Sequence, residues 1–305
     1  MRHVPVLLHE VMAALAPTAN QNFIDGTVGD AGHSEKILGL IAPHGQLLAI
    51  DADPESLMRS KQNLYTFGDR VLYERANFSE LERIVKEKQF GPVQGILLDL
   101  GWSSPQFEER GRGFSFTKDE PLDMRYPGAQ SMSDIMTAAE LINNADKNEL
   151  EQIFKNYGEE NLAKEIAQAI VEARKTKTIT KTSELVEIVL QVYRTKLKST
   201  KEVPWIGGLH PATKVFQALR IAVNNELGVV EEVIPQALQV LAKGGRLAII
   251  TFHSLEDRIV KHTFKDLEAK KIATIITKKP IECSPEEGAA NPRASSAKLR
   301  VLQKN

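Results

Sequence analysis

The chain has 305 residues, 42% of them apolar and 26% charged, as in an ordinary globular protein. This length suits one large domain, or a domain that carries a sizeable insertion. The sequence contains no run of eighteen apolar residues, so no transmembrane helix is predicted. Met1 to Glu10 lacks the pattern of a secretory signal. The single cysteine, Cys283, excludes a disulfide framework, so we expect a cytoplasmic protein in a reducing compartment.

The formal net charge is only −1, but positive charge is concentrated in one segment. The segment from Arg174 to Lys201 has eight basic residues and two acidic ones, Glu184 and Glu187, so its net charge is +6 (8 − 2). The basic residues are Arg174, Lys175, Lys177, Lys181, Arg194, Lys196, Lys198 and Lys201. Such a segment on a nearly neutral protein indicates a surface that faces a polyanion. A helical hairpin with solvated charges is the alternative.

Strand-like and helix-like patterns alternate over the first hundred residues. Apolar runs predict strands at Asn22 to Asp25, Gln46 to Ile50, Val71 to Tyr73 and Val93 to Leu98. Helical patterns lie between them, at His33 to Ile41, Pro54 to about Phe67, and Ser79 to Lys88. This alternation predicts parallel βαβ units whose sheet is buried on both faces.

From about Ser103 to Trp205 no such strand occurs. Helices are predicted instead, at Lys147 to Tyr157, Leu162 to Arg174 and Ser183 to Arg194, with Thr182 as the N-cap of the last. Beyond this region we expect helices near Ala212 to Glu226 and Val229 to Leu241, a strand at Leu247 to Phe252, and a closing strand pair at Ile272 to Thr277 and Leu299 to Leu302.

The most economical interpretation is an α/β fold with one doubly wound sheet that is interrupted by a mostly helical insertion. The sheet domain would comprise residues 1–104 and 206–305, and the insertion residues 105–205. In open α/β sheets ligands bind at the carboxyl ends of the strands, so the residues that follow each predicted strand are the candidates for a site.

A glycine-rich turn, Asp25-Gly26-Thr27-Val28-Gly29, follows the first predicted strand. Glycine allows close approach of the backbone to a ligand, although many such turns carry glycine for packing alone. Asp51 ends the second strand, 26 positions after Asp25, where an acid binds ribose hydroxyls. Asp53 lies directly before Pro54 and is more simply the acid that begins a helix.

Two features favour S-adenosylmethionine over a dinucleotide at this turn. The glycines at 26, 29 and 32 are spaced by three and do not give the Gly-x-Gly-x-x-Gly fingerprint. Gly244-Gly245 before the late strand resembles the turn before the fifth strand of class I methyltransferases. Asp99, at the tip of the fourth strand, suits the orientation of a target amine; a buried acid that caps the next turn is an equal alternative.

Seven sequence blocks resemble one family in order and over nearly the whole chain. They are Asp25 to Ser34, Asp99 to Gln106, Arg112 to Phe116, Pro121 to Arg125, Tyr157 to Glu160, His210 to Ile221 and Phe252 to Arg258. The chain is similar to the bacterial ribosomal RNA small-subunit methyltransferase H family, also called the MraW family. The resemblance implies a class I, Rossmann-like methyltransferase sheet and S-adenosylmethionine-dependent N4-methylation of a cytosine in the decoding region of 16S rRNA.

The resemblance also implies a set of cofactor-binding residues: Ala31, Gly32, His33, Asp51, Phe78, Asp99 and Gln106. The chain departs from the family at two positions, where the family usually has glycine for Ala31 and a small aliphatic residue for Trp102. Ala31 would contribute through its backbone, and an alanine fits there if its φ is negative.

Methyl transfer to an amine requires alignment and a proton acceptor but no covalent thiol, so Cys283 is not needed. The best candidates on the target side are Asp123, His253 and Ser254, although His253 could equally form a structural hydrogen bond within its turn. The histidines at 3, 9 and 33 lack metal-ligand spacing, and no metal is expected.

The expected partner is 16S rRNA or the small ribosomal subunit, whose target base would be extruded into the pocket. Candidate RNA contacts are Phe114 and Phe116 (stacking platforms or, more simply, loop anchors), Arg110, Arg112, the basic segment, Arg293, Lys298 and Arg300. No membrane partner is expected, and a homodimer is left open. The alternatives are a methyltransferase for another nucleic acid or a small molecule, and a non-catalytic RNA-binding assembly factor.

Overall fold

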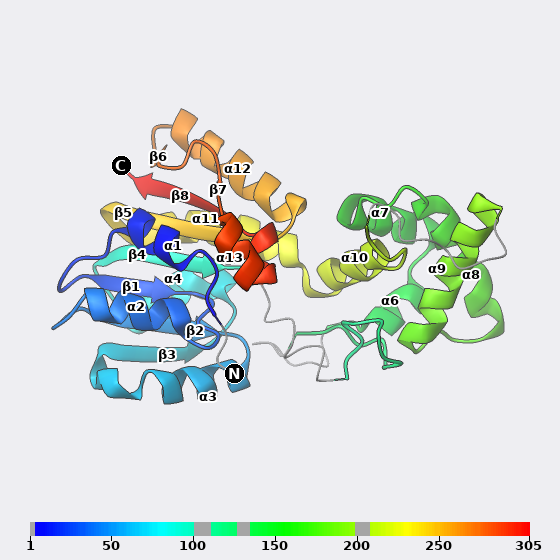
Figure 1. The fold of residues 1–305 in the computed structure, drawn as a ribbon, viewed down its shortest axis with the longest axis horizontal. Helices are drawn as coiled ribbons and strands as arrows, with labels where there is room; N and C mark the ends of the chain where they lie inside the picture. Colours follow the sequence, from blue (N-terminus) through cyan, green and yellow to red (C-terminus); the bar gives the residue numbers. More distant parts are fainter. Residues whose placement is uncertain (1–3, 101–110, 127–134, 199–207) are drawn as a thin grey trace. The chain divides into compact units, whose positions relative to one another are not determined.

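The computed structural model describes residues 4–100, 111–126, 135–198 and 208–305, and the chain divides into two compact units (Figure 1). The first, the sheet unit, comprises residues 1–101, 127–129 and 227–305. The second, the helical unit, comprises residues 102–126 and 130–226. None of the helices in the described ranges is both long and apolar enough to cross a bilayer.

Strands of the sheet unit follow the order β3-β2-β1-β4-β5-β8-β6, and β7 pairs with β8. The first five are parallel, while β8 runs antiparallel to both β5 and β6. The strands are β1 (Asn22–Asp25), β2 (Leu47–Asp51), β3 (Val71–Arg75), β4 (Val93–Asp99), β5 (Leu241–Thr251), β6 (Ala273–Ile275), β7 (Ile281–Glu282) and β8 (Lys298–Lys304). The predicted α/β class and the closing strand pair are confirmed, and the pair is antiparallel; β7 was not predicted.

Helices cover both faces of this sheet, because successive side chains of its strands enter two different cores. Phe23 and Leu47 lie in the core beneath α1, α2 and α3, and Ile24 and Leu48 lie in the core with α4, α11 and α12. The helices are α1 (Leu8–Leu15), α2 (Gly32–Leu40), α3 (Pro54–Asn63), α4 (Leu81–Glu87), α11 (Glu226–Val240), α12 (Ser254–Ala269) and α13 (Pro285–Ala290), with 3-10 turns η1 (Tyr65–Arg70), η2 (Phe78–Glu80) and η4 (Pro292–Ser296).

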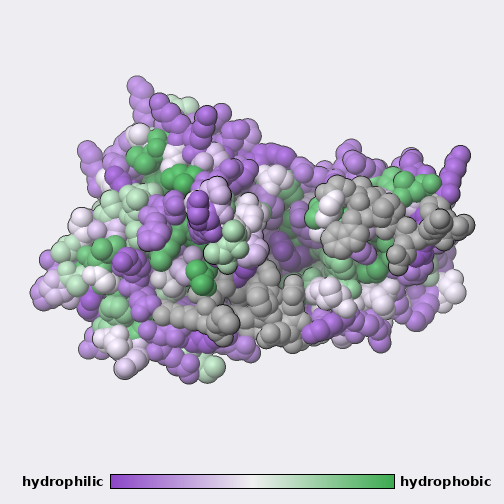
Figure 2. All heavy atoms as spheres, viewed as in Figure 1, coloured by the Kyte–Doolittle hydropathy of each residue, from purple (hydrophilic) through white to green (hydrophobic). Residues whose placement is uncertain are grey.

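Helix α12, which was not predicted, is amphipathic. It buries Leu255, Val260 and Phe264 against the sheet. Its outer face carries exposed Lys261 and Lys265 and forms the hydrophilic rim at the top left of Figure 2. The alternation of apolar and charged residues therefore positions Ser254, the first residue of α12, at the carboxyl end of β5.

The helical unit consists of α6 (Ala138–Asn144), α7 (Lys147–Gly158), α8 (Ala163–Thr176), α9 (Thr182–Leu197) and α10 (Thr213–Asn224) around its own apolar core. Among the described residues between 103 and 205, no strand of three or more residues occurs, as predicted.

Helix α10 belongs to the helical unit and not to the sheet unit. Lys214 donates from Nζ to the carbonyl of Glu159 (2.9 Å), and Gln217 donates to the carbonyl of Tyr157 (3.1 Å), so α10 is bound to the end of α7. The structure therefore places the second unit boundary between Glu226 and Leu227, later than the predicted 205/206.

Thr182 is not the N-cap that the sequence predicts. Helix α9 begins at Thr182 itself, and its buried hydroxyl donates to the carbonyl of Lys118 (2.7 Å) and accepts from the N–H of Glu120 (3.0 Å). The hydroxyl thus joins α9 to a loop some sixty residues away.

Candidate cofactor site

The turn after β1 is built on a buried carboxylate, Asp25, which is 2% exposed. One oxygen accepts a hydrogen bond from the Ser34 hydroxyl (2.6 Å), and the other accepts from the Thr27 N–H (3.1 Å). Burial raises the pKa of Asp25 to about 6, although these hydrogen bonds act in the opposite direction. The group therefore fixes the turn and does not face solvent.

Gly26 is required by close packing. A Cβ at this position would lie 2.5 Å from Cδ2 of Leu98 and 3.4 Å from Cβ of Phe78. Only glycine lets the backbone pass between β4 and Phe78, so the turn remains narrow. Phe78 lies in η2, whose N-cap, Asn77, accepts from the Ser79 N–H (2.9 Å).

Ala31 adopts the left-handed conformation, with φ 64° and ψ 27°, as the N-cap of α2. The negative φ that would let an alanine fit without strain is therefore not observed. The conformation is imposed locally, because the Ala31 N–H donates to Val28 (2.7 Å) while its carbonyl already accepts from Glu35 in the first helical turn (2.9 Å). An alanine here accepts the backbone strain that glycine, usual in the family, would avoid.

His33 is buried and faces two groups. Its Nε2 lies 2.9 Å from the carbonyl of Val6, and a carbonyl only accepts, so Nε2 carries the proton. Nδ1 then faces the Asp99 carboxylate at 4.0 Å. The imidazole consequently connects the segment before α1 with the tip of β4.

Asp51 ends β2 with its carboxylate held by backbone donors. One oxygen accepts from the Gly29 N–H and the other from the Asp53 N–H, both at 2.9 Å. Burial raises the pKa of Asp51 to about 6, the two hydrogen bonds lower it, and the neighbouring charges of Asp53 and Asp25 raise it. Asp53 caps α3 by accepting from the Glu55 N–H (3.1 Å), which confirms the predicted helix-starting role.

The carboxyl ends of four parallel strands thus bring together most of the predicted cofactor residues. The edge holds Ala31, Gly32 and His33 after β1, Asp51 at the end of β2, Phe78 after β3, and Asp99 at the end of β4. Gln106, like Trp102 and Arg110, lies outside the described residues. An acid held by backbone N–H groups, a narrow glycine turn and an aromatic side chain fit a nucleoside that carries a ribose.

His253 is the N-cap of α12. Its Nδ1 accepts from the Glu256 N–H at 3.3 Å, and its Nε2 lies 3.2 Å from the Glu256 carboxylate. Glu256 also accepts from the Phe252 N–H (2.9 Å), so both side chains bind the backbone at the start of α12. These contacts support the structural alternative for His253.

Asp123 belongs to the helical unit, where Arg125 binds it through two hydrogen bonds of 2.7 and 3.0 Å. Although burial raises the pKa of Asp123, the hydrogen bonds and charge of Arg125 hold it below its ordinary value. A carboxylate with a low pKa is a weak proton acceptor at neutral pH. This environment favours a role for Asp123 in fixing its loop.

The two phenylalanines predicted as stacking platforms already have aromatic partners in the helical unit. Phe114 stacks on Tyr126 (centroids 5.5 Å apart), and Phe116 stacks on His210 (4.7 Å) and meets the edge of Phe216 (5.2 Å). Arg112, beside them, donates to the carbonyl of Arg125 (3.2 Å). These contacts are those of loop anchors.

The predicted basic surface is largely neutralised within the helical unit. Lys201 lies outside the described residues, and five of the other seven cations form ion pairs: Lys175 with Glu172, Lys177 with Glu184, Lys181 with Asp119, Arg194 with Glu187, and Lys196 with Glu165. Arg174 donates instead to the carbonyls of Ile142 and Ala145 at the end of α6. This pattern supports the alternative, a solvated helical hairpin.

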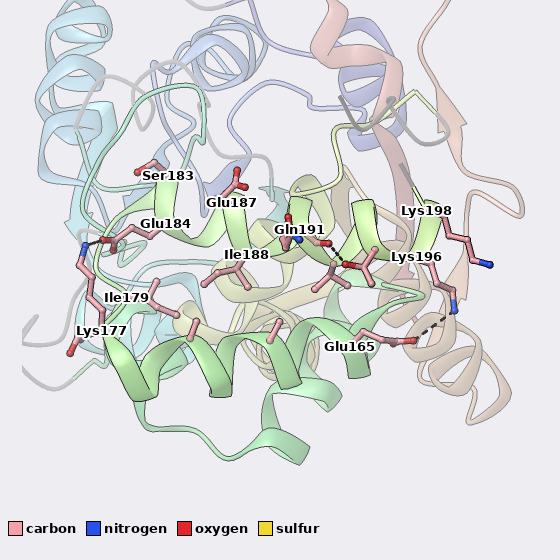
Figure 3. Close-up of a pocket in the computed structure, with 15 residues that line it drawn as sticks. Glu165, Lys177, Ile179, Ser183, Glu184, Glu187, Ile188, Gln191, Lys196 and Lys198 are labelled. Atoms are coloured by element: carbon pink, nitrogen blue, oxygen red, sulfur yellow. Dashed lines mark hydrogen bonds and ion pairs between the residues drawn. The ribbon is translucent and has the colours of Figure 1, made fainter. Parts of the chain in front are cut away.

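A groove of about 1330 Å³ lies between α8 and α9, and most of its charged residues are paired as well (Figure 3). Its wall includes the apolar side chains of Ile179, Ile188 and Val192. At its two ends lie the ion pairs of Lys177 with Glu184 and of Lys196 with Glu165 (Figure 3). Because these charges are paired, they add no net attraction for a polyanion.

Two further cations predicted as RNA contacts are also paired. Arg300 is buried and binds Asp257 through hydrogen bonds of 2.6 and 2.9 Å, and Lys298 lies 3.8 Å from Glu282. Arg300 therefore holds β8 to α12 and is not available to a phosphate.

A family model described as the MraW methylase family matches residues 1–305. The chain belongs to this family. A Ribosomal RNA small subunit methyltransferase H of Heliobacterium modesticaldum is 44% identical over 99% of this chain and 98% of that protein. One from Symbiobacterium thermophilum is 43% identical over 99% of this chain and 96% of that protein.

The predicted family, the methyltransferase class and the cofactor, S-adenosylmethionine, are confirmed by these matches. A SAM-dependent O-methyltransferase from Thermotoga maritima superposes with a TM-score of 0.42 and 10% identity, over 99% of this chain and 67% of that chain. Membership in the MraW family depends on the sequence match and not on this distant likeness.

Proposed function

We propose that this MraW-family methylase transfers a methyl group to N4 of a cytosine in the decoding region of 16S rRNA. The observation that carries the substrate is the name shared by relatives that are 42–44% identical over 99% of the chain, Ribosomal RNA small subunit methyltransferase H. The sequence blocks that resemble this family support the finer assignment to cytosine N4.

Bound S-adenosylmethionine supplies an electrophilic methyl group for in-line displacement by an amine. The chain's own task is to hold the donor, align the amine and exclude water. We assign Asp51 to accept hydrogen bonds from both ribose hydroxyls, and its fixed position, held by the N–H groups of Gly29 and Asp53, supports this role. Phe78 offers an aromatic surface to the adenine beside the turn at Gly26.

The single cysteine of the chain favours methylation of the cytosine amine over methylation of C5. Attack at C5 of cytosine requires a thiolate that adds to the ring. The sole cysteine, Cys283, is half-buried and packs against the core beneath β8. N4-methylation needs no such nucleophile.

The test is mass spectrometry of nucleosides from the 16S rRNA of a deletion strain complemented with wild type or Asp51→Ala. N4-methylated cytidine should disappear on deletion and return only with the wild type, while C5-methylated cytidine stays constant as the internal control. If no N4-methylated cytidine is lost, the substrate assignment fails.

A second measurement separates the rival functions. Purified enzyme with labelled cofactor should methylate small ribosomal subunits from the deletion strain and not duplex DNA. Calorimetry should detect binding of S-adenosylmethionine that Asp51→Ala weakens; absence of binding would identify a non-catalytic assembly factor instead.

A further inference from the structure

The C-terminal segment α13–η4 is bound to the chain segment that precedes α1. The Leu7 N–H donates to Oε1 of Glu287 in α13 (2.7 Å). Asn291, between α13 and η4, donates from Nδ2 to the carbonyl of Val4 (3.3 Å). Residues 4–7 therefore fix where η4 begins.

The same residues 4–7 contact the cofactor turn. The carbonyl of Val6 accepts from His33, and a Cβ on Gly32 would lie 2.9 Å from the ring of Pro5. Ala294, in η4, is fully buried in the core cluster that also contains Ala31. Residues 4–7 therefore bind both the segment that carries η4 and the turn after β1, where His33 faces Asp99 at the tip of β4 (4.0 Å).

Arg293 lies in η4 next to Ala294, and its side chain is half-buried. Burial lowers the pKa of the Arg293 guanidinium, and the carboxylates of Asp99 and Asp30 act against this shift. Asp30 is also bound by Arg59 at 2.7 Å. A guanidinium stays ionised and has five N–H donors, so attraction to Asp99 leaves donors for a second carboxylate.

We propose that Arg293 and Asp99 form the subsite for the amino-acid end of S-adenosylmethionine, with Arg293 binding the α-carboxylate and Asp99 the α-ammonium. The inference rests on the proposed function, in which this cofactor is the methyl donor. Its α-carboxylate and α-ammonium are attached to one carbon atom, so a cation and an anion that attract each other at one edge of the sheet match both groups at once.

The charge around Arg293 argues against its assignment to an RNA phosphate. The carboxylates of Asp99, Asp30 and Asp51 lie at this edge, together with the cations of Arg293 and Arg59. Such surroundings repel a polyanion. S-adenosylmethionine carries a sulfonium and an ammonium against one carboxylate, and its net positive charge suits the same surroundings.

The experiment compares the affinities of S-adenosylmethionine and its decarboxylated analogue by calorimetry. The wild type should bind the analogue about 10- to 100-fold more weakly, the effect of one charge-assisted pair. Arg293→Gln should weaken S-adenosylmethionine by the same factor and change the analogue less than about threefold. Asp99→Asn should weaken both ligands, because both retain the ammonium group.

Lys243→Gln is the matched control, since it removes an exposed positive charge at the opposite end of β5 and should alter neither affinity. Thermal unfolding without ligand shows whether each variant is folded, and the wild-type comparison needs no variant.

Equal affinity of the wild type for both ligands would overturn the proposal, as would equal weakening of both by Arg293→Gln. Weaker RNA binding by Arg293→Gln with both cofactor affinities unchanged would overturn it in favour of a phosphate contact. Failure of the proposed function would appear separately, as unchanged rRNA methylation in the deletion strain.

Discussion

The side-chain oxygen of Thr27 accepts a hydrogen bond from the backbone N–H of Asp99 at 2.7 Å. Two residues earlier, Asp25 accepts from the Thr27 N–H and from Ser34 at the start of α2. One turn therefore joins the tips of β1 and β4 to the first turn of a helix. The position of Asp99 depends on this turn as much as on its own strand.

Thr27→Val should lower the free energy of unfolding by about 1–3 kcal/mol, because the N–H of Asp99 loses its acceptor. Thr27→Ser keeps the hydroxyl and should lose less than about 1 kcal/mol. Urea denaturation at neutral pH compares the two variants. A larger loss with Thr27→Ser than with Thr27→Val would mean that the methyl group of Thr27, and not its oxygen, carries the effect.

Ala31→Gly should leave stability within about 1 kcal/mol of the wild type. Relief of the left-handed alanine gains roughly 1–2 kcal/mol. Loss of the buried methyl group costs about 0.8 kcal/mol, and the freer unfolded chain costs about 0.4–1 kcal/mol. Ala31→Val should lose more than about 2 kcal/mol, because a β-branched residue tolerates positive φ poorly and the site is fully buried. Thermal unfolding of both variants checks this, and a large loss with glycine would show that packing outweighs backbone strain.

The raised pKa of Asp25 predicts a pH-dependent stability. Its carboxyl has a pKa of about 6 in the folded chain and about 4 when unfolded. Between about pH 4 and 6 the folded chain keeps a proton that the unfolded chain has lost, so the stability of the wild type falls as pH rises through this window. The Asp25→Asn variant has no carboxyl group to ionise at this position. Its stability relative to the wild type should therefore increase as pH rises through the same window, by roughly 1.4 kcal/mol per unit of pKa shift. Urea denaturation along a pH series measures the difference, and a constant difference would contradict the assignment.

Because His253 caps α12, we expect its substitution to change stability and not catalysis. His253→Ala should cost about 1 kcal/mol in stability, the usual effect of losing an N-cap. His253→Asn supplies another good cap and should keep both stability and methyl transfer to small subunits within about threefold. A fall of a hundredfold or more in kcat for the folded asparagine variant would assign His253 to the target side of the reaction.

Much of the site could be predicted from the sequence, because an acidic residue stands at the end of each of three buried strands. Asp25, Asp51 and Asp99 each follow an apolar run, and parallel strands bring their carboxyl ends to one edge. The sequence alone therefore places these three residues together. A local signal for the His253 cap was also present, since Glu256 stands three residues later, the spacing of a capping box.

Contacts between distant segments were not predictable in the same way. Lys181 pairs with Asp119, 62 residues earlier, and a charge count over one segment cannot include such partners. The attraction between Arg293 and Asp99 likewise depends on residues 4–7, which bind both the segment that carries η4 and the cofactor turn. The positive φ of Ala31 has no signal in an alanine and appears only in the backbone.

The strand order has a consequence for synthesis of the chain. Strand β8 comes last in the sequence but lies between β5 and β6, and the only strand that β6 pairs with in the described sheet is β8. While residues 298–304 are still inside the ribosome, β5 has an open edge and β6 has no place to dock. The helical unit, nearly contiguous in sequence, can complete its core much earlier. Nascent chains stalled just before β8 should therefore show a protease-resistant helical unit while the sheet unit is still cleaved.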